Sequence, residues 1–298
     1  MKRKLIFLIS ILLLCSSKIL LQNYPRVTLI SAHERTIKSN IVDGMEYVLN
    51  IALPEGYNDT TLTYPVVYML DAYDLFGLQL QTYQQLAYFE DVPKLILVGI
   101  NYNLGNEEYY KNLTEYEYLR SRDYTPTALE KEEIIKKYGI NYACYIKESG
   151  GSDKFLRFFN EEIIPFIESE YRTDPNDRCI LGFSHGGLFT TYPLFYSPET
   201  FQKIFIGSPA LWWDDDVVFT YCDPSKYKPL ANPVKVYLSI GELEGKGIKA
   251  SYDKLKEFID EKENTRIELT TETLPNERHL IGIGMAFSRA FRRLCGDK

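Results

Sequence analysis

The chain has 298 residues, of which 45% are hydrophobic and 25% charged, and its formal net charge is −7. This length and apolar content suffice for one large α/β domain with a buried core, or for two small ones. The acidic balance and the lack of a basic stripe argue against a nucleic-acid partner, because neutralising phosphates requires clustered Lys and Arg.

The first residues have the pattern of a secretory signal. Met1-Lys2-Arg3-Lys4 is basic, residues 5–14 are apolar, and small residues follow at Cys15-Ser16-Ser17. The apolar run is short for a spanning helix, and Lys18 interrupts it. We therefore expect an exported protein, periplasmic or secreted, with residues 1–22 as its signal peptide. The alternative is an uncleaved N-terminal anchor, which would be the chain's one link to a membrane.

Predicted strands and helices alternate along residues 26–298, which we expect to form a single α/β domain. The predicted strands are residues 46–53, 64–70, 95–100, the run that ends at Gly182, 201–206, 234–240 and 266–271. The predicted helices are residues 74–90, 129–138, 153–170 with a kink or break at Pro165, the segment from Gly186, 250–263 and 281–294. Such alternation implies right-handed crossovers and a central, mostly parallel sheet flanked by helices.

One segment does not fit this alternation. From Asn101 to about Gly150, tyrosines lie among acidic and amide residues. The segment is too long for a plain connection, and long excursions from α/β folds often carry binding function. An equally good interpretation is a surface insertion that packs on its own helix at residues 129–138.

A Gly-x-Ser-x-Gly motif lies between a predicted strand and a predicted helix, near the middle of the expected sheet. In this context the motif is typical of a nucleophile elbow, a sharp turn that presents a serine hydroxyl at the carboxyl end of the sheet. Gly182 and Gly186 flank Ser184 where side chains would clash. We predict that Ser184 is a nucleophile; the alternative is a tight turn with an ordinary serine.

A serine hydroxyl needs a base to take its proton, and the chain has three histidines. His33 precedes the first predicted strand, far from the edge where the elbow opens. His185 adjoins the serine, but its side chain is expected to point elsewhere. His279 lies after the last strand and before the last helix, in a loop expected at the catalytic edge, so we predict that His279 is the general base.

A carboxylate is needed to orient the histidine and stabilise its positive charge. Glu242 and Glu244 both follow the predicted strand that ends at Ile240, and the order serine, acid, histidine is that of α/β-hydrolases. Glu244 fits the usual distance past the strand, and Glu242 is its competitor.

Two further expectations concern the oxyanion and cofactors. The oxyanion requires preorganised donors, for which we predict the backbone amides of His185 and Tyr73. No histidine or cysteine spacing suggests a metal site, and no glycine-rich loop suggests a nucleotide, so no cofactor is expected.

Cys179 is expected to be a small buried side chain. An export route permits a disulfide among Cys144, Cys222 and Cys295, which the sequence leaves open.

Several motifs together resemble the esterase D-like family of α/β-hydrolases, and in particular its branch of siderophore trilactone esterases. They cover nearly the whole chain after residue 50: Leu53-Pro54-Glu55-Gly56-Tyr57, Tyr64-Pro65-Val66-Val67-Tyr68-Met69-Leu70-Asp71, Arg120-Ser121-Arg122-Asp123-Tyr124-Thr125-Pro126, Gly150-Gly151-Ser152-Asp153-Lys154-Phe155, Gly182-Phe183-Ser184-His185-Gly186-Gly187, Ser208-Pro209-Ala210-Leu211-Trp212-Trp213 and Gly241-Glu242-Leu243-Glu244. Ala72 departs from the pattern, since family members usually carry glycine there.

The resemblance implies the same nucleophile, base and oxyanion amides, and it implies that Arg122, Trp212 and Trp213 border the substrate cleft. Arg122 would then clamp an anionic or catechol-bearing substrate, or else it pins the insertion through a salt bridge. The two tryptophans could instead be core residues. The implied activity is hydrolysis of a carboxylic ester, either a siderophore lactone or an esterified carbohydrate. An acyltransferase of the mycolyltransferase type and a non-catalytic binding protein are the alternatives.

Overall fold

A computed structural model of the chain describes residues 28–105, 109–227, 230–261 and 266–296. The signal peptide or anchor predicted for residues 1–22 lies outside them. Within the described ranges, no helix combines the length and the apolar character needed to cross a membrane.

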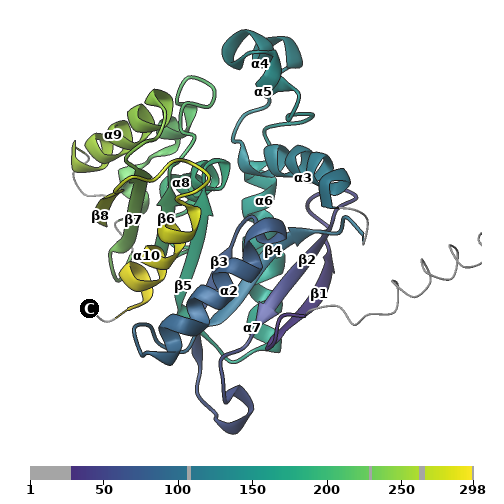
Figure 1. The fold of residues 1–298 in the computed structure, drawn as a ribbon, viewed down its shortest axis with the longest axis vertical. Coiled ribbons are helices and arrows are strands. Elements are labelled where there is room, and N and C mark those ends of the chain that lie inside the picture. Colours follow the sequence, from purple (N-terminus) through teal and green to yellow (C-terminus); the bar gives the residue numbers. More distant parts are fainter. Residues whose placement is uncertain (1–27, 106–108, 228–229, 262–265, 297–298) are drawn as a thin grey trace, which may run out of the picture. The chain divides into compact units, whose positions relative to one another are not determined.

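Eight strands in the described part of the chain form one sheet, in the order β1-β2-β4-β3-β5-β6-β7-β8 (Figure 1). All neighbouring strands from β4 to β8 run parallel, whereas β1 and β2 add two antiparallel pairings at one edge. The mostly parallel sheet predicted from the sequence is thereby confirmed. The strands are β1 (Ala32–Lys38), β2 (Glu46–Ala52), β3 (Tyr64–Met69), β4 (Ile96–Tyr102), β5 (Thr173–Phe183), β6 (Lys203–Gly207), β7 (Val234–Gly241) and β8 (Ile267–Leu274).

Helices cover both faces of the sheet and create two separate apolar clusters. On one face, α2 (Ala72–Tyr88) and α10 (Ile283–Cys295) bury residues such as Phe76 and Phe291. The larger cluster lies on the other face, beneath α6 (Ser152–Phe158), α7 (Ile164–Glu170), α8 (His185–Tyr196) and α9 (Lys246–Glu261). The sheet is thus buried on both sides, which explains why its central strands are nearly continuous apolar runs.

The insertion between β4 and α6 is largely helical. It contains α3 (Tyr109–Tyr124), α4 (Lys131–Tyr138) and α5 (Ile140–Ala143). Short 3-10 helices lie elsewhere, at Tyr57–Asp59, Val217–Tyr221 and Pro224–Tyr227. The helix expected at residues 129–138 corresponds to α4, whereas α3 and the edge strand β1 were not predicted. Neither shows a clear apolar period: β1 is mostly exposed and pairs through its backbone, and α3 is attached mainly by polar and aromatic side chains.

The helix predicted for residues 153–170, with a kink or break expected at Pro165, continues through this proline but is irregular just before it. A π-helical turn, Phe159–Ile163, joins α6 to α7, and Pro165 lies in the first turn of α7. Proline has no N–H for the helical ladder, and the widened turn absorbs the missing bond. The segment therefore departs from regular α geometry without breaking, and its apolar side chains still face the sheet.

The four cysteines of the described residues are present as thiols. Cys179 is buried in β5, as predicted, and it shares its apolar cluster with Cys295 at the end of α10. Cys144 and Cys222 lie nearer the surface. No disulfide therefore joins these four residues.

Candidate active site

Ser184 occupies a strained turn between β5 and α8. Its φ of 59° and ψ of −116° lie outside the common regions for residues with a side chain. A Cβ atom on Gly182 would come within 2.2 Å of the carbonyl oxygen of Gly186, so this close approach of strand and helix requires glycine. The turn lifts the Ser184 side chain to the carboxyl edge of the sheet.

His279 reaches Ser184 from the loop between β8 and α10. Its Nε2 lies 3.0 Å from the Oγ of Ser184, across 95 residues of sequence. Its Nδ1 lies 3.0 and 3.1 Å from the two carboxylate oxygens of Glu244. An ionised carboxylate only accepts hydrogen bonds, so Nδ1 carries the proton and Nε2 is left to accept one from Ser184. The residues predicted as nucleophile, base and acid therefore form one hydrogen-bonded chain.

Glu242 and Glu244, the two candidate acids in the turn after β7, have different partners. The Glu244 side chain is only 2% exposed and faces His279. Glu242 instead accepts a hydrogen bond from the backbone N–H of Asn276, at 2.8 Å. Asn276 has a positive φ of 58° and lies three residues before His279. Glu242 thus holds the backbone of the histidine loop, while Glu244 contacts the imidazole itself.

The two predicted oxyanion donors lie at the N-termini of two helices that meet beside Ser184. His185 is the first residue of α8 and Tyr73 is the second of α2. The helices approach closely, because a Cβ on Gly186 would lie 3.1 Å from Oδ2 of Asp71. The positive ends of both helix dipoles therefore face the region where negative charge would develop.

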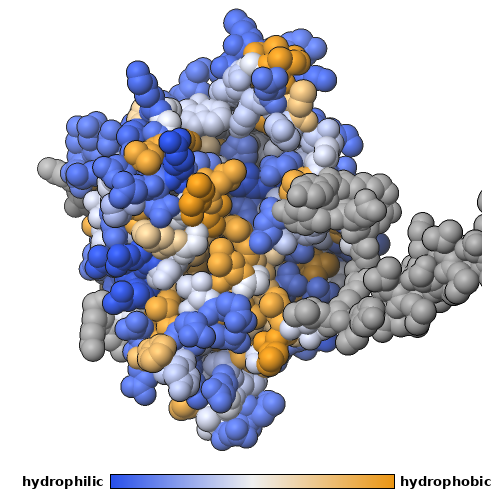
Figure 2. All heavy atoms as spheres, in the orientation of Figure 1, coloured by the Kyte–Doolittle hydropathy of each residue, from blue (hydrophilic) through white to orange (hydrophobic). Residues whose placement is uncertain are grey.

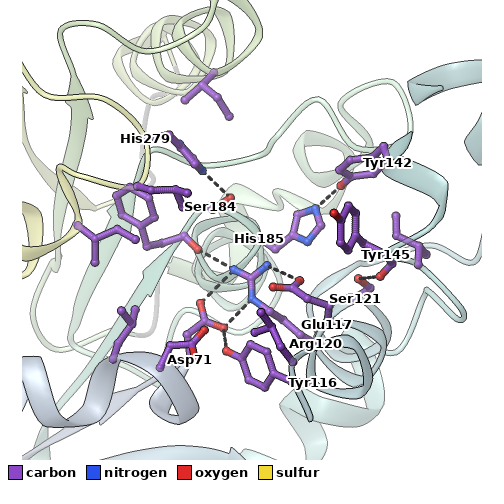
Figure 3. A pocket seen from close by; sticks show the side chains of 18 of the residues that line it. Asp71, Tyr116, Glu117, Arg120, Ser121, Tyr142, Tyr145, Ser184, His185 and His279 are labelled. Atoms are coloured by element: carbon purple, nitrogen blue, oxygen red, sulfur yellow. Dashed lines mark hydrogen bonds and ion pairs between the residues drawn. The ribbon is translucent and has the colours of Figure 1, made fainter. Parts of the chain in front are cut away.

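Asp71 and Arg120 form a buried ion pair that the sequence analysis did not predict. Nε and Nη2 of Arg120 donate to the two carboxylate oxygens of Asp71, at 2.6 and 3.0 Å (Figure 3). Tyr116 adds a hydroxyl hydrogen bond to Asp71 at 2.6 Å, and Nη2 also donates to the carbonyl of Phe183. Burial acts to lower the pKa of Arg120, but Asp71, together with Glu117 and Tyr116, raises this pKa overall. The pair attaches α3 to the start of α2 beside the nucleophile.

Glu117 lies on α3 one turn before Arg120 and also faces the cleft (Figure 3). Its carboxylate is 3.7 Å from Nη1 of Arg120, and its side chain is 30% exposed. Burial raises the pKa of Glu117, and the positive charge of Arg120 counteracts only part of this effect. One helix face therefore brings a cation and an anion to the site.

The side chain of His185 does not point away from the site, contrary to expectation. It lines the cleft, and its Nε2 is hydrogen-bonded to the hydroxyl of Tyr142 on α5 (Figure 3). Its Nδ1 is buried with no hydrogen-bond partner among the described residues. Burial, together with the nearby Arg120 and His279, lowers the pKa of His185 to about 3. The ring is consequently neutral at physiological pH and forms part of the cleft wall.

Of the three residues expected to contact substrate, only Trp212 lines the cleft. Trp213 is fully buried, and its Nε1 donates to Thr127 at 3.1 Å. Arg122 donates to Asp123 at 2.7 Å and to the Tyr47 hydroxyl, so its charge is used inside the fold. The clamp expected at Arg122 is therefore not at the cleft. Its salt bridge is with the next residue of α3, and the hydrogen bonds of this pair with the Tyr47 hydroxyl attach the insertion to β2.

The cleft around Ser184 has a volume of about 740 Å³. Much of its wall is apolar: Leu75, Leu113, Ile146, Ile248, Leu280 and Ile283. On the face of the molecule shown in Figure 2, apolar surface gathers in the middle, over α2 and the loop before α10. Leu280 and Ile281 beside His279 are 76% and 77% exposed. Among the described residues, no three His, Cys, Asp or Glu side chains are grouped to hold a metal ion.

Comparisons with known proteins identify the family of the chain and proteins of similar fold. The family described as "Putative esterase" matches residues 39–281. The ferri-bacillibactin esterase BesA of Bacillus subtilis (strain 168) is 27% identical over 239 residues, which are 77% of this chain and 78% of the relative. The BES protein from Bacillus cereus superposes with a TM-score of 0.75 at 22% identity, covering 91% of this chain and 97% of that one. An IroE-like serine hydrolase from Shewanella oneidensis has a TM-score of 0.67 at 25% identity, covering 88% and 79%.

Proposed function

The chain belongs to the esterase family of α/β-hydrolases, and from this premise we propose that it is a serine carboxylic-ester hydrolase acting through an acyl-enzyme on Ser184. One observation carries the proposal. Ser184, His279 and Glu244 form a continuous hydrogen-bonded chain that opens into the cleft. In such a chain each neighbour supplies what a serine hydroxyl lacks, a base for its proton and a carboxylate for the charge that results.

The reaction begins when Nε2 of His279 takes the Ser184 proton while Oγ attacks the ester carbonyl. The tetrahedral oxyanion forms beside the N-termini of α2 and α8, where the amides of Tyr73 and His185 are the proposed donors. His279 then protonates the leaving alcohol, and the acyl group remains on Ser184. Water enters, loses a proton to His279 and releases the acid, which regenerates the hydroxyl.

We further propose that the substrates are siderophore esters, with esterified carbohydrates as the alternative. Relatives of this chain are named for ferri-bacillibactin and apo-salmochelin. A cleft of about 740 Å³ with aromatic and apolar walls accommodates a bulky acyl or alcohol group. Transfer of the acyl group to an alcohol instead of water uses the same residues, but four of the five curated relatives are named as esterases.

We also propose that the protein is exported, on the basis of its N-terminal residues alone. The basic start and apolar run at residues 1–22 support a periplasmic or secreted location. Expressing the full chain and sequencing the N-terminus of the exported product tests this. A cytoplasmic product with an intact N-terminus would contradict it.

Turnover of p-nitrophenyl butyrate by wild type, Ser184→Ala and Ser169→Ala tests the enzymatic proposal. Ser169 is exposed on α7, so its variant controls for removing a hydroxyl. We expect Ser184→Ala to lose at least about 1,000-fold in kcat and to resist labelling by a fluorophosphonate, while Ser169→Ala stays near wild type. Turnover that does not depend on Ser184 would refute the mechanism and leave a binding protein as the remaining reading.

A further inference from the structure

The charges in the cleft wall are unbalanced. Among the described residues that line it and whose charged partners are given above, Asp71, Glu117 and Glu244 carry carboxylates, and Arg120 carries the guanidinium. Three carboxylates against one guanidinium leave two negative charges in excess when His279 is neutral. Walls of low dielectric strengthen the field of such charges inside a cleft.

Arg120 is not available as an anion receptor. Its Nε and Nη2 are engaged by Asp71, Nη2 also donates to the carbonyl of Phe183, and Nη1 faces Glu117 at 3.7 Å. Only 11% of its side chain is exposed. A guanidinium attracts a carboxylate or catecholate strongly only when its fork is unoccupied. The positive charge at this wall is therefore already compensated by the protein.

Glu117 is the carboxylate in this group best placed to act on a substrate. Asp71 is occupied by Arg120 and Tyr116, and Glu244 is occupied by His279. Glu117 contacts Arg120 only at 3.7 Å and keeps nearly a third of its side chain exposed to the cleft. Figure 3 shows it on the wall that faces Ser184 and His185. Its charge therefore reaches a bound ester with less compensation than theirs.

The rest of the wall favours groups without charge. Leu75, Leu113 and Ile283 present apolar surface, and Tyr142 and Trp212 present aromatic rings. Such surface binds apolar and aromatic parts of a substrate and supplies no counter-charge for an anion. An anionic ester would lose hydration in this cleft and meet an excess of negative charge.

We propose that the cleft selects its esters by charge: it accepts uncharged and cationic esters and disfavours anionic ones, and Glu117 is the specificity-determining residue. The proposal rests on the esterase function proposed above. The proposal implies that the preferred substrate carries no net negative charge, as in a protonated, metal-free catechol ester. The selection acts on the affinity of the cleft for an ester and on the rate at which the ester enters, because like charges weaken the complex and slow the encounter.

Three p-nitrophenyl esters of equal acyl length test the proposal: valeryl, ω-sulfovaleryl and ω-trimethylammoniovaleryl. They differ in acyl charge and share a leaving group, and the sulfonate is too weak a nucleophile to assist hydrolysis. At about 20 mM salt, we expect kcat/KM for the neutral and cationic esters to exceed that for the anionic ester by roughly 10-fold or more. In about 0.5 M NaCl the difference should shrink severalfold, because the Debye length falls below the width of the cleft.

Glu117→Gln should raise the ratio of kcat/KM for the anionic ester to kcat/KM for the neutral ester about 3- to 10-fold at low salt. Glu115→Gln is the matched control: it makes the same change on α3, at an exposed residue outside the cleft wall. Glu117→Lys should reverse part of the preference. Turnover of the neutral ester shows that each variant is folded.

The outcomes separate the two proposals. If no ester is hydrolysed in a Ser184-dependent manner, the proposed function fails. If the esters are hydrolysed but the anionic one keeps pace with the neutral one at low salt, only the inference on charge is overturned. A preference that Glu117→Gln alters no more than Glu115→Gln removes the role assigned to Glu117.

Discussion

Both carboxylate oxygens of Glu244 lie within 3.1 Å of Nδ1 of His279, although the two residues come from loops after different strands. The contact sets the tautomer of the imidazole and leaves Nε2 facing Ser184. Glu242, two residues earlier, contacts the backbone of Asn276 instead. Glu244 therefore acts on the imidazole, whereas Glu242 acts on the backbone of the loop that carries it, and single substitutions can separate the two effects.

Glu244→Gln should lower kcat about 100- to 10,000-fold with little change in KM, because an amide can stabilise the wrong imidazole tautomer and cannot balance an imidazolium. Steady-state kinetics on a neutral p-nitrophenyl ester measures this loss. Glu242→Gln serves as the control and should lose far less activity, since its contact is with a backbone amide. Equal losses in the two variants, or a larger loss at Glu242, would reassign the acid.

Asp71→Asn should destabilise the fold by about 3–5 kcal/mol, because it leaves the buried guanidinium of Arg120 without its counter-charge. Urea unfolding followed by tryptophan fluorescence gives the free energy of unfolding. Adding Arg120→Gln should recover part of that loss, since the double variant no longer buries an unpaired charge. Asp91→Asn, in a surface pair with Arg292, should cost less than about 1 kcal/mol. A loss at Asp71 as small as that at Asp91 would show that the buried pair contributes little.

The pH dependence of stability should report His185. Its pKa is about 3 in the folded protein, against an ordinary value near 6.5, so the unfolded chain takes up a proton below pH 6.5 that the folded one does not. This lowers the free energy of unfolding as the pH falls, by about 2 kcal/mol between pH 7.5 and pH 5.

His185→Gln removes the titrating ring and keeps a hydrogen-bonding group near Tyr142. Its free energy of unfolding should therefore lie about 2 kcal/mol closer to that of wild type at pH 5 than at pH 7.5. Tyr142→Phe keeps the histidine, so its stability gap should stay roughly constant with pH. Urea unfolding of the three proteins at both pH values checks this. Parallel behaviour of His185→Gln and Tyr142→Phe would mean that His185 titrates normally.

A metal-free tricatechol trilactone should be hydrolysed faster than its Fe(III) complex. Three catecholates around Fe(III) give a trianion, which would enter a cleft whose described wall already carries excess negative charge. Chromatographic rates for both forms, at low and high salt, measure the preference. The gap should narrow at high salt and in Glu117→Gln. Faster hydrolysis of the ferric form by wild type would contradict the charge argument.

Sequence and structure agree where local chemistry determines the outcome. Apolar runs at β3, β4 and β7 identify buried strands, and the Gly-Phe-Ser-His-Gly turn can hardly fold as anything but a strand-to-helix elbow. Because parallel strands end at one edge, the sequence also indicated that the loop of His279 would meet the elbow. The edge strand β1 escaped prediction because an exposed strand paired on one side needs no apolar pattern.

The sequence by itself determined the order of the elements, the elbow at Ser184 and the arrival of His279 at the same sheet edge. Only the tertiary structure decided which neighbour of a pair reaches the cleft. Arg120 and Arg122 are two residues apart on α3, so their side chains leave the helix about 200° apart. The packing of α3 against α6 and α8 places Arg120 beside Asp71, whereas Arg122 pairs with its neighbour Asp123 and contacts the Tyr47 hydroxyl of β2. The pairing of Arg120 with Asp71 joins residues 49 positions apart, and no local sequence pattern records such a contact.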